Sequence, residues 1–178
     1  MNNQTISYRV LLTKDQIAAR TKELAEEINK EFRGCDLILI CNLKGAFIFL
    51  ADLCRMITVP HELDFIATSS YRGETSSSGV VRIVKDLKAN IENKHVLIVE
   101  DIIDTGLTLD YVKKYLSIHN PASIKVVTLL DKKETRRIAI EADYVGFDIP
   151  DKFVLGYGLD FSEKYRNLDC IAEYIRDE

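Results

Sequence analysis

Largely apolar runs alternate along the chain with segments in which apolar residues recur at helical spacing. The runs at residues 36–41, 96–99 and 124–130 are rich in β-branched side chains, as is typical of strands buried on both faces of a parallel sheet. Helical spacing follows at 107–118 and precedes the first run at 13–33. This alternation predicts an α/β fold in one domain, residues 1–178, with a mostly parallel twisted sheet flanked by helices.

Local signals mark the ends of these elements. Thr13 and Gln16 form a capping box at the start of the first helix, and Gly34 is suited to ending it. A second helix is expected at residues 46–56. Strands are predicted at 63–68 and 80–84, joined by a mobile loop that contains five serines and two glycines. Short strands are expected at 144–147 and 153–155, with some helical character at 132–142.

Four charged residues lie just past the ends of predicted strands: Lys44, Asp101, Asp104 and Lys132. In parallel sheets the ligand binds beyond the carboxyl ends of the strands. We therefore expect these four side chains to converge on one rim of the sheet.

The segment after the run at 96–99 contains the densest group of candidate ligand-binding residues in the sequence. It places three carboxylates, Glu100, Asp101 and Asp104, at a strand end, and Thr105-Gly106 then opens a helix. Carboxylates can hold ribose hydroxyls and Mg²⁺, and the free N–H groups of a helix N-terminus can hold a phosphate. A receiver domain would carry such acids nearer its N-terminus, and Walker and dinucleotide-binding glycine motifs are absent or incomplete. The predicted ligand is a sugar phosphate.

Composition narrows the expected partners. The net charge of −4 argues against a nucleic-acid scaffold held by counterion release. No signal peptide is recognisable, and no apolar run approaches the roughly 18 residues of a membrane span, so a cytoplasmic protein is expected. The four cysteines lack C-x-x-C spacing and the three histidines are scattered, which predicts packing roles rather than a metal motif.

The segment 100–106 resembles the phosphoribosyl-pyrophosphate (PRPP) motif of the type I phosphoribosyltransferases. Further segments narrow the resemblance to the hypoxanthine-guanine phosphoribosyltransferases, and especially to their bacterial branch; they are 43–45, 70–71, 129–132, 143–147 and 149–160. They stand in the family's order from about residue 6 to the C-terminus. The resemblance implies the type I phosphoribosyltransferase fold, with a lid within about residues 60–85 and a small hood built from the terminal segments, to which 150–178 contribute.

The implied reaction transfers the 5-phosphoribosyl group from PRPP to N9 of hypoxanthine or guanine. It gives IMP or GMP and pyrophosphate through an oxocarbenium-like state, with Mg²⁺ as cofactor. By resemblance, Glu100 and Asp101 hold the ribose hydroxyls. Asp104 matches the general base near purine N7, with a helix cap as its competing role.

The same resemblance assigns the loop that wraps the 5′-phosphate to residues 104–108. Backbone N–H groups and the hydroxyls of Thr105 and Thr108 are the expected donors, and Gly106 permits close backbone approach. Leu107 is apolar where some relatives have a basic residue, so the backbone donors are expected to supply more of the contact.

Pyrophosphate and metal ligands are also implied by the resemblance. Lys44 and Gly45 match the pyrophosphate loop, in which the family has a non-proline cis peptide between the equivalents of Leu43 and Lys44. Arg166 matches a second pyrophosphate contact, with an ordinary surface arginine as the competing interpretation. The expected Mg²⁺ ligands are Glu100, Asp101 and Asp160.

For the purine, Lys132 matches the residue that donates to the 6-oxo group, which would disfavour adenine. Phe153 matches the aromatic that stacks on the ring, and Val154 the residue whose backbone reads its edge. Ser70 and Tyr71 match the lid that closes over the reacting centre.

Arg136 resembles a pyrophosphate contact from a neighbouring subunit, which points to a homodimer or homotetramer. Two other functions agree less well with the sequence. One is a regulator that keeps the fold to sense PRPP or nucleotides and binds RNA or DNA, which the charge and the complete set of Lys44, Asp104 and Lys132 disfavour. The other is a pyrimidine or adenine transferase, with which Lys132 conflicts. The choice among hypoxanthine, guanine and xanthine stays open.

Overall fold

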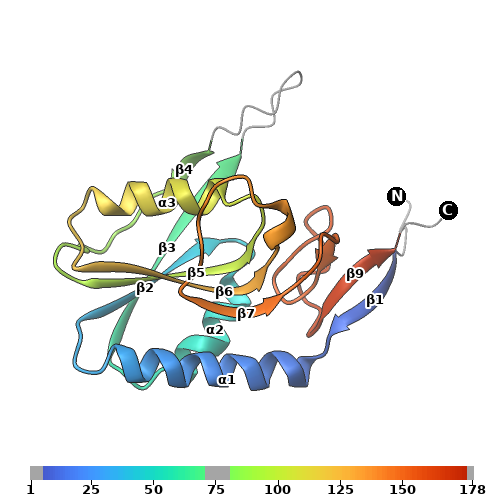
Figure 1. The fold of residues 1–178 in the computed structure, drawn as a ribbon, viewed down its shortest axis with the longest axis horizontal. Helices are drawn as coiled ribbons and strands as arrows, with labels where there is room; N and C mark the ends of the chain where they lie inside the picture. Colours follow the sequence, from blue (N-terminus) through green and yellow to red (C-terminus); the bar gives the residue numbers. More distant parts are fainter. Residues whose placement is uncertain (1–5, 71–80, 176–178) are drawn as a thin grey trace.

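A six-stranded sheet forms the centre of the computed structural model, which describes residues 6–70 and 81–175 (Figure 1). Its strands lie in the order β4-β3-β2-β5-β6-β7, and every neighbouring pair is parallel except β3 and β4. The predicted mostly parallel sheet is therefore confirmed. The bounds are Leu37–Leu43 for β2, His61–Ser70 for β3, Val81–Lys85 for β4, His95–Ile103 for β5, Ser123–Asp131 for β6 and Tyr144–Asp148 for β7.

Helices cover both faces of this sheet because alternate residues of each strand point to opposite sides. Leu39 of β2 belongs to the core beneath α1 and α2, whereas its neighbour Ile40 belongs to the core beneath α3 (Figure 1). Both core layers are closed to solvent, so the charged residues that follow the strands are left at the rim. The helices are α1, Lys14–Glu31; α2, Phe47–Met56; and α3, Leu107–Ser117.

A second, three-stranded antiparallel sheet is built from the two ends of the chain. Its order is β1-β9-β8, with β1 at Ser7–Leu12, β9 at Ile171–Ile175 and β8 at Val154–Leu155. In Figure 1 it lies beyond one end of α1, at the right of the main sheet. This sheet is the hood that the sequence predicts from the terminal segments.

The strand order reverses direction between β2 and β5. The connection from β2 through α2 leads to β3 on one side, and the connection from β5 through α3 leads to β6 on the other. The crevice beyond the carboxyl ends of two strands at such a point is the usual ligand site of open parallel sheets. The topology of the sheet therefore predicts a ligand site at the segments that follow Leu43 and Ile103.

Some elements differ from the expectation. Between 132 and 142 only Lys133–Thr135 forms a 3₁₀ turn, because the N–H groups of Arg137 and Ile138 bind the carbonyl of Thr105 instead of continuing a helix. The predicted strand at 153–155 is limited to two residues, and most of the predicted loop at 69–79 lies outside the described residues. The capping box of α1 is present, with the Thr13 N–H donating to Gln16 Oε1 at 2.9 Å.

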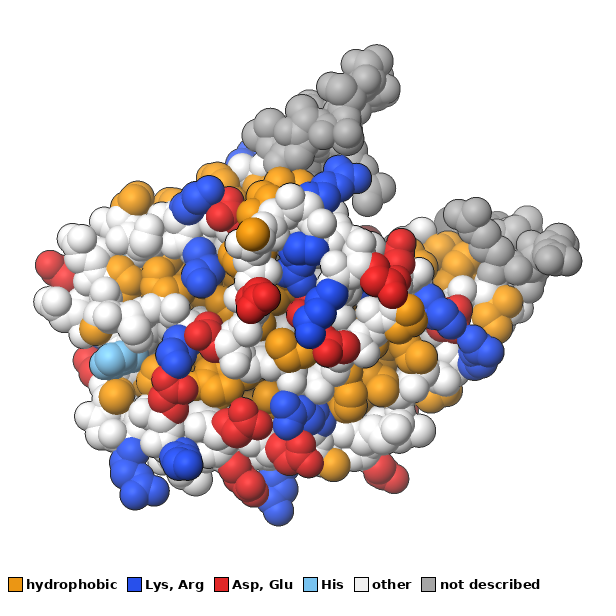
Figure 2. Space-filling view, in the orientation of Figure 1, with side chains coloured by type: hydrophobic (Ala, Val, Ile, Leu, Met, Phe, Trp, Pro, Cys, Tyr) orange, Lys and Arg blue, Asp and Glu red, His pale blue; other side chains and the backbone are white. Residues whose placement is uncertain are grey.

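Charges of both signs are interspersed on the molecular face drawn in Figure 2. Lysine and arginine side chains alternate there with aspartate and glutamate, so this face offers no continuous basic surface. Among the described helices, none is long and apolar enough to cross a membrane.

Candidate active site

A cavity of about 290 Å³ lies beyond the carboxyl ends of β2 and β5. Most of its wall comes from the acidic segment and the first turn of α3, and the opposite wall comes from β2, the turn after it and β3. The lining residues are Asn42, Leu43, Gly45, Thr68, Glu100, Asp101, Ile102, Ile103, Asp104, Thr105, Gly106, Thr108 and Leu109. The structure thus brings three of the predicted acids and the predicted phosphate loop around one space.

Two carboxylates are held away from water at this wall. Glu100 is 4% exposed, and its burial, together with the neighbouring Asp101 charge, raises its pKa well above the usual range. Burial also raises the pKa of Asp101 to about 6, although backbone N–H groups and the positive charge of Arg166 act in the opposite direction. Such carboxylates gain from a ligand that brings hydroxyl donors or a cation.

Asn42 is a polar partner that the sequence interpretation missed. Its Nδ2 donates to Glu100 Oε1 at 3.2 Å, and its Oδ1 accepts from Thr68 Oγ1 at 3.3 Å. The amide is buried and links β3, β2 and β5 across the cavity wall. The sequence feature that could have identified Asn42 is its position, since it is a polar residue that directly follows five apolar residues at the end of a buried strand.

The turn after β2 lies directly against Asp101. A Cβ atom at Gly45 would be 1.6 Å from Asp101 Oδ2, and one at Gly158 would be 2.0 Å from the Gly45 carbonyl oxygen. The peptide bond between Leu43 and Lys44 is cis, as the resemblance implies. The two glycines therefore allow the hood segment to pack closely on this turn, and the turn to pack closely on the Asp101 side chain.

The start of α3 has the form of an anion site. Gly106 is the N-cap residue with a φ of +84°, and it offers no side-chain cap. The N–H groups of the first turn therefore lack intrahelical acceptors and face the cavity side. Asp104 does not cap the helix, and no hydrogen bond or ion pair is formed by its side chain within the described part of the chain. Its competing structural role is thus absent, which leaves its carboxylate free at the cavity.

The two predicted pyrophosphate contacts share one acidic partner. Lys44 Nζ lies 2.7 Å from Glu163 Oε2, and Arg166 Nη2 lies 3.3 Å from Glu163 Oε1 and 2.9 Å from Asp160 Oδ1. The hydrogen bonds from these cations lower the pKa of Glu163 below its usual range. Arg166 also donates to the Gly158 carbonyl at 2.8 Å, so it is tied to the hood and is not an unattached surface arginine.

The predicted purine residues lie apart from the cavity wall. Lys132 is 7% exposed, follows β6 directly, and has its Nζ 3.7 Å from Asp151 Oδ1. Phe153 is 53% exposed and makes edge contacts with Phe161 and Tyr174, with ring centroids 5.8 Å and 6.1 Å away. Val154 is buried in β8. Lys44 and Arg166 are likewise outside the residues that line the cavity.

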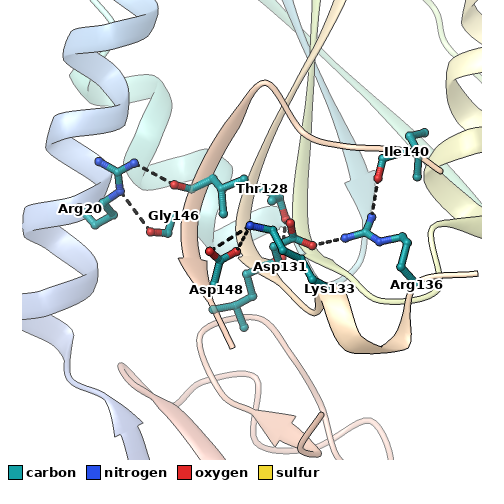
Figure 3. Close-up of polar contacts among 10 residues, drawn as sticks. Arg20, Thr128, Asp131, Lys133, Arg136, Ile140, Gly146 and Asp148 are labelled. Carbon is teal, nitrogen blue, oxygen red and sulfur yellow. Dashed lines mark hydrogen bonds and ion pairs between the residues drawn. The ribbon is translucent and has the colours of Figure 1, made fainter. Parts of the chain in front are cut away.

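Arg136 contacts two groups of its own chain. Figure 3 shows its guanidinium between the Asp131 carboxylate and the Ile140 carbonyl of the same chain. Its Cδ would lie 3.2 Å from a Cβ at Gly106, so the side chain packs beside the phosphate loop. Arg136 therefore braces that loop within its own chain. The contact to a neighbouring subunit stays a prediction. The neighbouring Lys133 pairs with Asp148 at 2.9 Å (Figure 3).

The expected lid lies partly outside the described residues. Ser70 ends β3, and Tyr71 lies outside the described residues, so the lid stays a prediction. Within residues 6–70 and 81–175, no three His, Cys, Asp or Glu side chains are arranged to hold a metal ion. The expected set of Glu100, Asp101 and Asp160 is therefore not a preformed cage.

Comparison with known proteins agrees with this geometry. The model of the phosphoribosyl transferase domain matches residues 7–162. This chain belongs to the phosphoribosyltransferase family. A relative from Mycobacterium tuberculosis, named hypoxanthine-guanine phosphoribosyltransferase, is 52% identical to this phosphoribosyltransferase over 169 residues, covering 92% of this chain and 84% of its own.

Two further relatives support the assignment at the level of sequence and fold. The hypoxanthine phosphoribosyltransferase of Buchnera aphidicola is 48% identical, with 94% of this phosphoribosyltransferase and 96% of the relative covered. A crystal structure of a hypoxanthine phosphoribosyltransferase from Staphylococcus aureus superposes with a TM-score of 0.90 at 46% identity, covering 94% of this chain and 91% of that one. The fold and the branch that the sequence predicts are both confirmed.

Proposed function

We propose that this phosphoribosyltransferase transfers the 5-phosphoribosyl group of PRPP to N9 of hypoxanthine or guanine, forming IMP or GMP and pyrophosphate in purine salvage. The observation that carries the proposal is the cavity in which Glu100 and Asp101 lie beside the first turn of α3. That arrangement offers acceptors for two ribose hydroxyls next to donors for a 5′-phosphate. The choice of hypoxanthine and guanine as acceptor bases follows the names of the relatives.

In the reaction, the bond from C1 of the ribose to a pyrophosphate oxygen breaks and a bond from C1 to purine N9 forms. Glu100 and Asp101 hold the ribose and stabilise positive charge that develops on it. Asp104 lines the cavity and accepts the proton that the purine loses. Lys44 and Arg166, the pyrophosphate clamp, hold the negative charge of the departing group.

Mg²⁺ fits the chemistry of the acids. Glu100 and Asp101 are oxygen donors whose ionisation is disfavoured by burial, and a divalent cation would offset that cost. Together with Asp160 they would hold the ion, with substrate oxygens and water completing its ligands, as Mg²⁺ usually requires. When bound, Mg²⁺ would neutralise charge on the pyrophosphate.

Base selection rests on residues at the end of β6 and in the hood. The buried ammonium of Lys132 would donate to the 6-oxo group of the purine, and an adenine amino group there would leave two donors facing each other. Phe153 presents an exposed ring for stacking, supported from two sides by other rings. The backbone of Val154 would read the edge of the base.

The proposal extends to the domain organisation, the lid and the assembly of the enzyme. Residues 1–178 form one phosphoribosyltransferase domain in which Ser70 and Tyr71 contribute to a lid over the reacting centre. The enzyme assembles as a homodimer or homotetramer. A cytoplasmic location and the absence of nucleic-acid and membrane partners stay predictions from the sequence.

The deciding experiment measures steady-state rates with hypoxanthine, guanine, xanthine and adenine at fixed Mg-PRPP. Turnover with the 6-oxo purines and little with adenine is expected, and Lys132→Met should remove most of that discrimination while PRPP binding persists. PRPP binding without turnover on any base would refute the enzyme and favour the PRPP-sensing regulator.

A further inference from the structure

Glu163 occupies an unusual position for an acid, because both of its cationic partners are the predicted contacts of an anion. One carboxylate oxygen accepts from Lys44 Nζ at 2.7 Å, and the other accepts from Arg166 Nη2 at 3.3 Å. The acid therefore bridges the two members of the pyrophosphate clamp. A carboxylate placed between these two cations offers them negative charge and oxygen acceptors, as a phosphate group does.

A hydrogen bond fixes the backbone at Glu163, whereas its side chain is held by exposed ion pairs with the clamp. The Glu163 N–H donates to Asp160 Oδ2 at 2.8 Å, and φ is positive at both Ser162 (+52°) and Glu163 (+63°). This turn aims the side chain at the clamp. The Glu163 side chain is 67% exposed, as is that of Lys44, so rotation of the carboxylate into solvent meets no packed neighbours.

We propose that Glu163 is a displaceable counterion, which occupies the pyrophosphate clamp in the absence of ligand and swings out when PRPP or pyrophosphate binds. This inference rests on the proposed function of Lys44 and Arg166. Its physical consequence is competition, since the carboxylate and the ligand anion need the same two cations. Glu163 therefore weakens pyrophosphate binding, and it assists departure of the leaving group by returning to the clamp.

The test compares the wild type with Glu163→Gln, which keeps the size of the side chain and removes its charge. Binding of Mg-pyrophosphate is measured by calorimetry, and product inhibition by pyrophosphate is measured against PRPP. Exposed ion pairs are individually weak, so the two together predict about a three- to tenfold tighter binding of pyrophosphate and a lower KM for PRPP. The KM for hypoxanthine should stay within twofold, because the acceptor does not use the clamp.

Two further variants keep the result interpretable. Glu163→Asn removes the carboxylate with a residue that tolerates positive φ, and it should show the same gain. Glu62→Gln makes the same change of charge in an exposed ion pair with Lys94, at the opposite end of β3 from the cavity, and it should leave pyrophosphate affinity unchanged.

Each outcome decides between the alternatives. Weaker binding in both Glu163 variants would show that the acid orders the clamp for its ligand, and unchanged binding would reduce the contact to an ordinary surface ion pair; either overturns the proposal. If the wild type forms nucleotide but the variants gain no affinity, only the counterion role fails. If the wild type neither forms nucleotide nor binds pyrophosphate, the proposed function fails together with it.

Discussion

A substitution at Gly45 provides the most direct test of how the turn after β2 positions Asp101. The perturbation is Gly45→Ala, a single methyl group. Its Cβ would lie 1.6 Å from Asp101 Oδ2 and 2.6 Å from Asp101 Cγ, whereas ordinary contact begins near 3.4 Å. The φ of Gly45 is not in the left-handed region, so the substitution acts through this contact and not through backbone strain.

The size of the effect follows from the displacement required. Either the Asp101 carboxylate or the turn must move by about 1.8 Å to restore ordinary contact. A misplacement of roughly 1 Å at a reacting centre can cost about 10²-fold in rate, or about 2.7 kcal/mol of transition-state stabilisation. We therefore expect kcat/KM for PRPP to fall at least about 100-fold, measured by following IMP formation at saturating hypoxanthine.

The control is Gly34→Ala, which lies at a site where a Cβ meets no atom within 4 Å but φ is +78°. That substitution should destabilise the fold by about 1–2 kcal/mol through backbone strain and leave kcat/KM unchanged. Thermal unfolding of both variants separates lost stability from lost positioning. If Gly45→Ala retains kcat/KM within threefold of the wild type, the turn is free to yield, and the argument that it fixes Asp101 is wrong.

Three other changes test the remaining parts of the site. Asp104→Asn should lower kcat by about 10²–10⁴ while calorimetry shows PRPP binding largely intact; unchanged turnover would remove Asp104 as the base. Asn42→Leu takes away the amide donor to Glu100, so the KM for PRPP should rise about 10–100-fold, and an equal rise in the KM for hypoxanthine would contradict a local effect. The pKa of Asp101 is raised to about 6. Between pH 4 and 7 the folded protein therefore binds more protons than the unfolded chain. The free energy of unfolding should consequently fall as the pH rises through that window. In urea titrations at pH 4 and pH 8, Asp101→Asn should remove about 1–2 kcal/mol of that fall, and parallel pH slopes would contradict it.

The parts of the fold that the sequence predicts well are those with local causes. The buried runs of β2, β5 and β6 are long, apolar and β-branched, and the connection rules for parallel strands then place the following acids and lysines at one rim. The capping box of α1 is a local device as well, and it is present at Thr13 and Gln16.

The parts that escaped prediction depend on distant contacts. Strands β1 and β9 are only six and five residues long, and each pairs with the opposite end of the chain, so neither gives a clear local signal of its own. The segment after Lys132 has apolar residues suited to a helix, yet the Thr105 carbonyl captures its N–H groups. Glu163 offers no local signal, because its partner Lys44 lies 119 residues away in the sequence.

The separation between the donor cavity and the acceptor residues has a consequence for how such an enzyme can diversify. Lys132, Phe153 and Val154 lie outside the cavity wall, on the end of β6 and in a small sheet made from the chain termini. Under the proposed function, substitutions there would change which base is accepted without disturbing the carboxylates or the helix start at the cavity. Base preference and binding of the phosphoribosyl donor would then be altered by substitutions in separate segments of the chain.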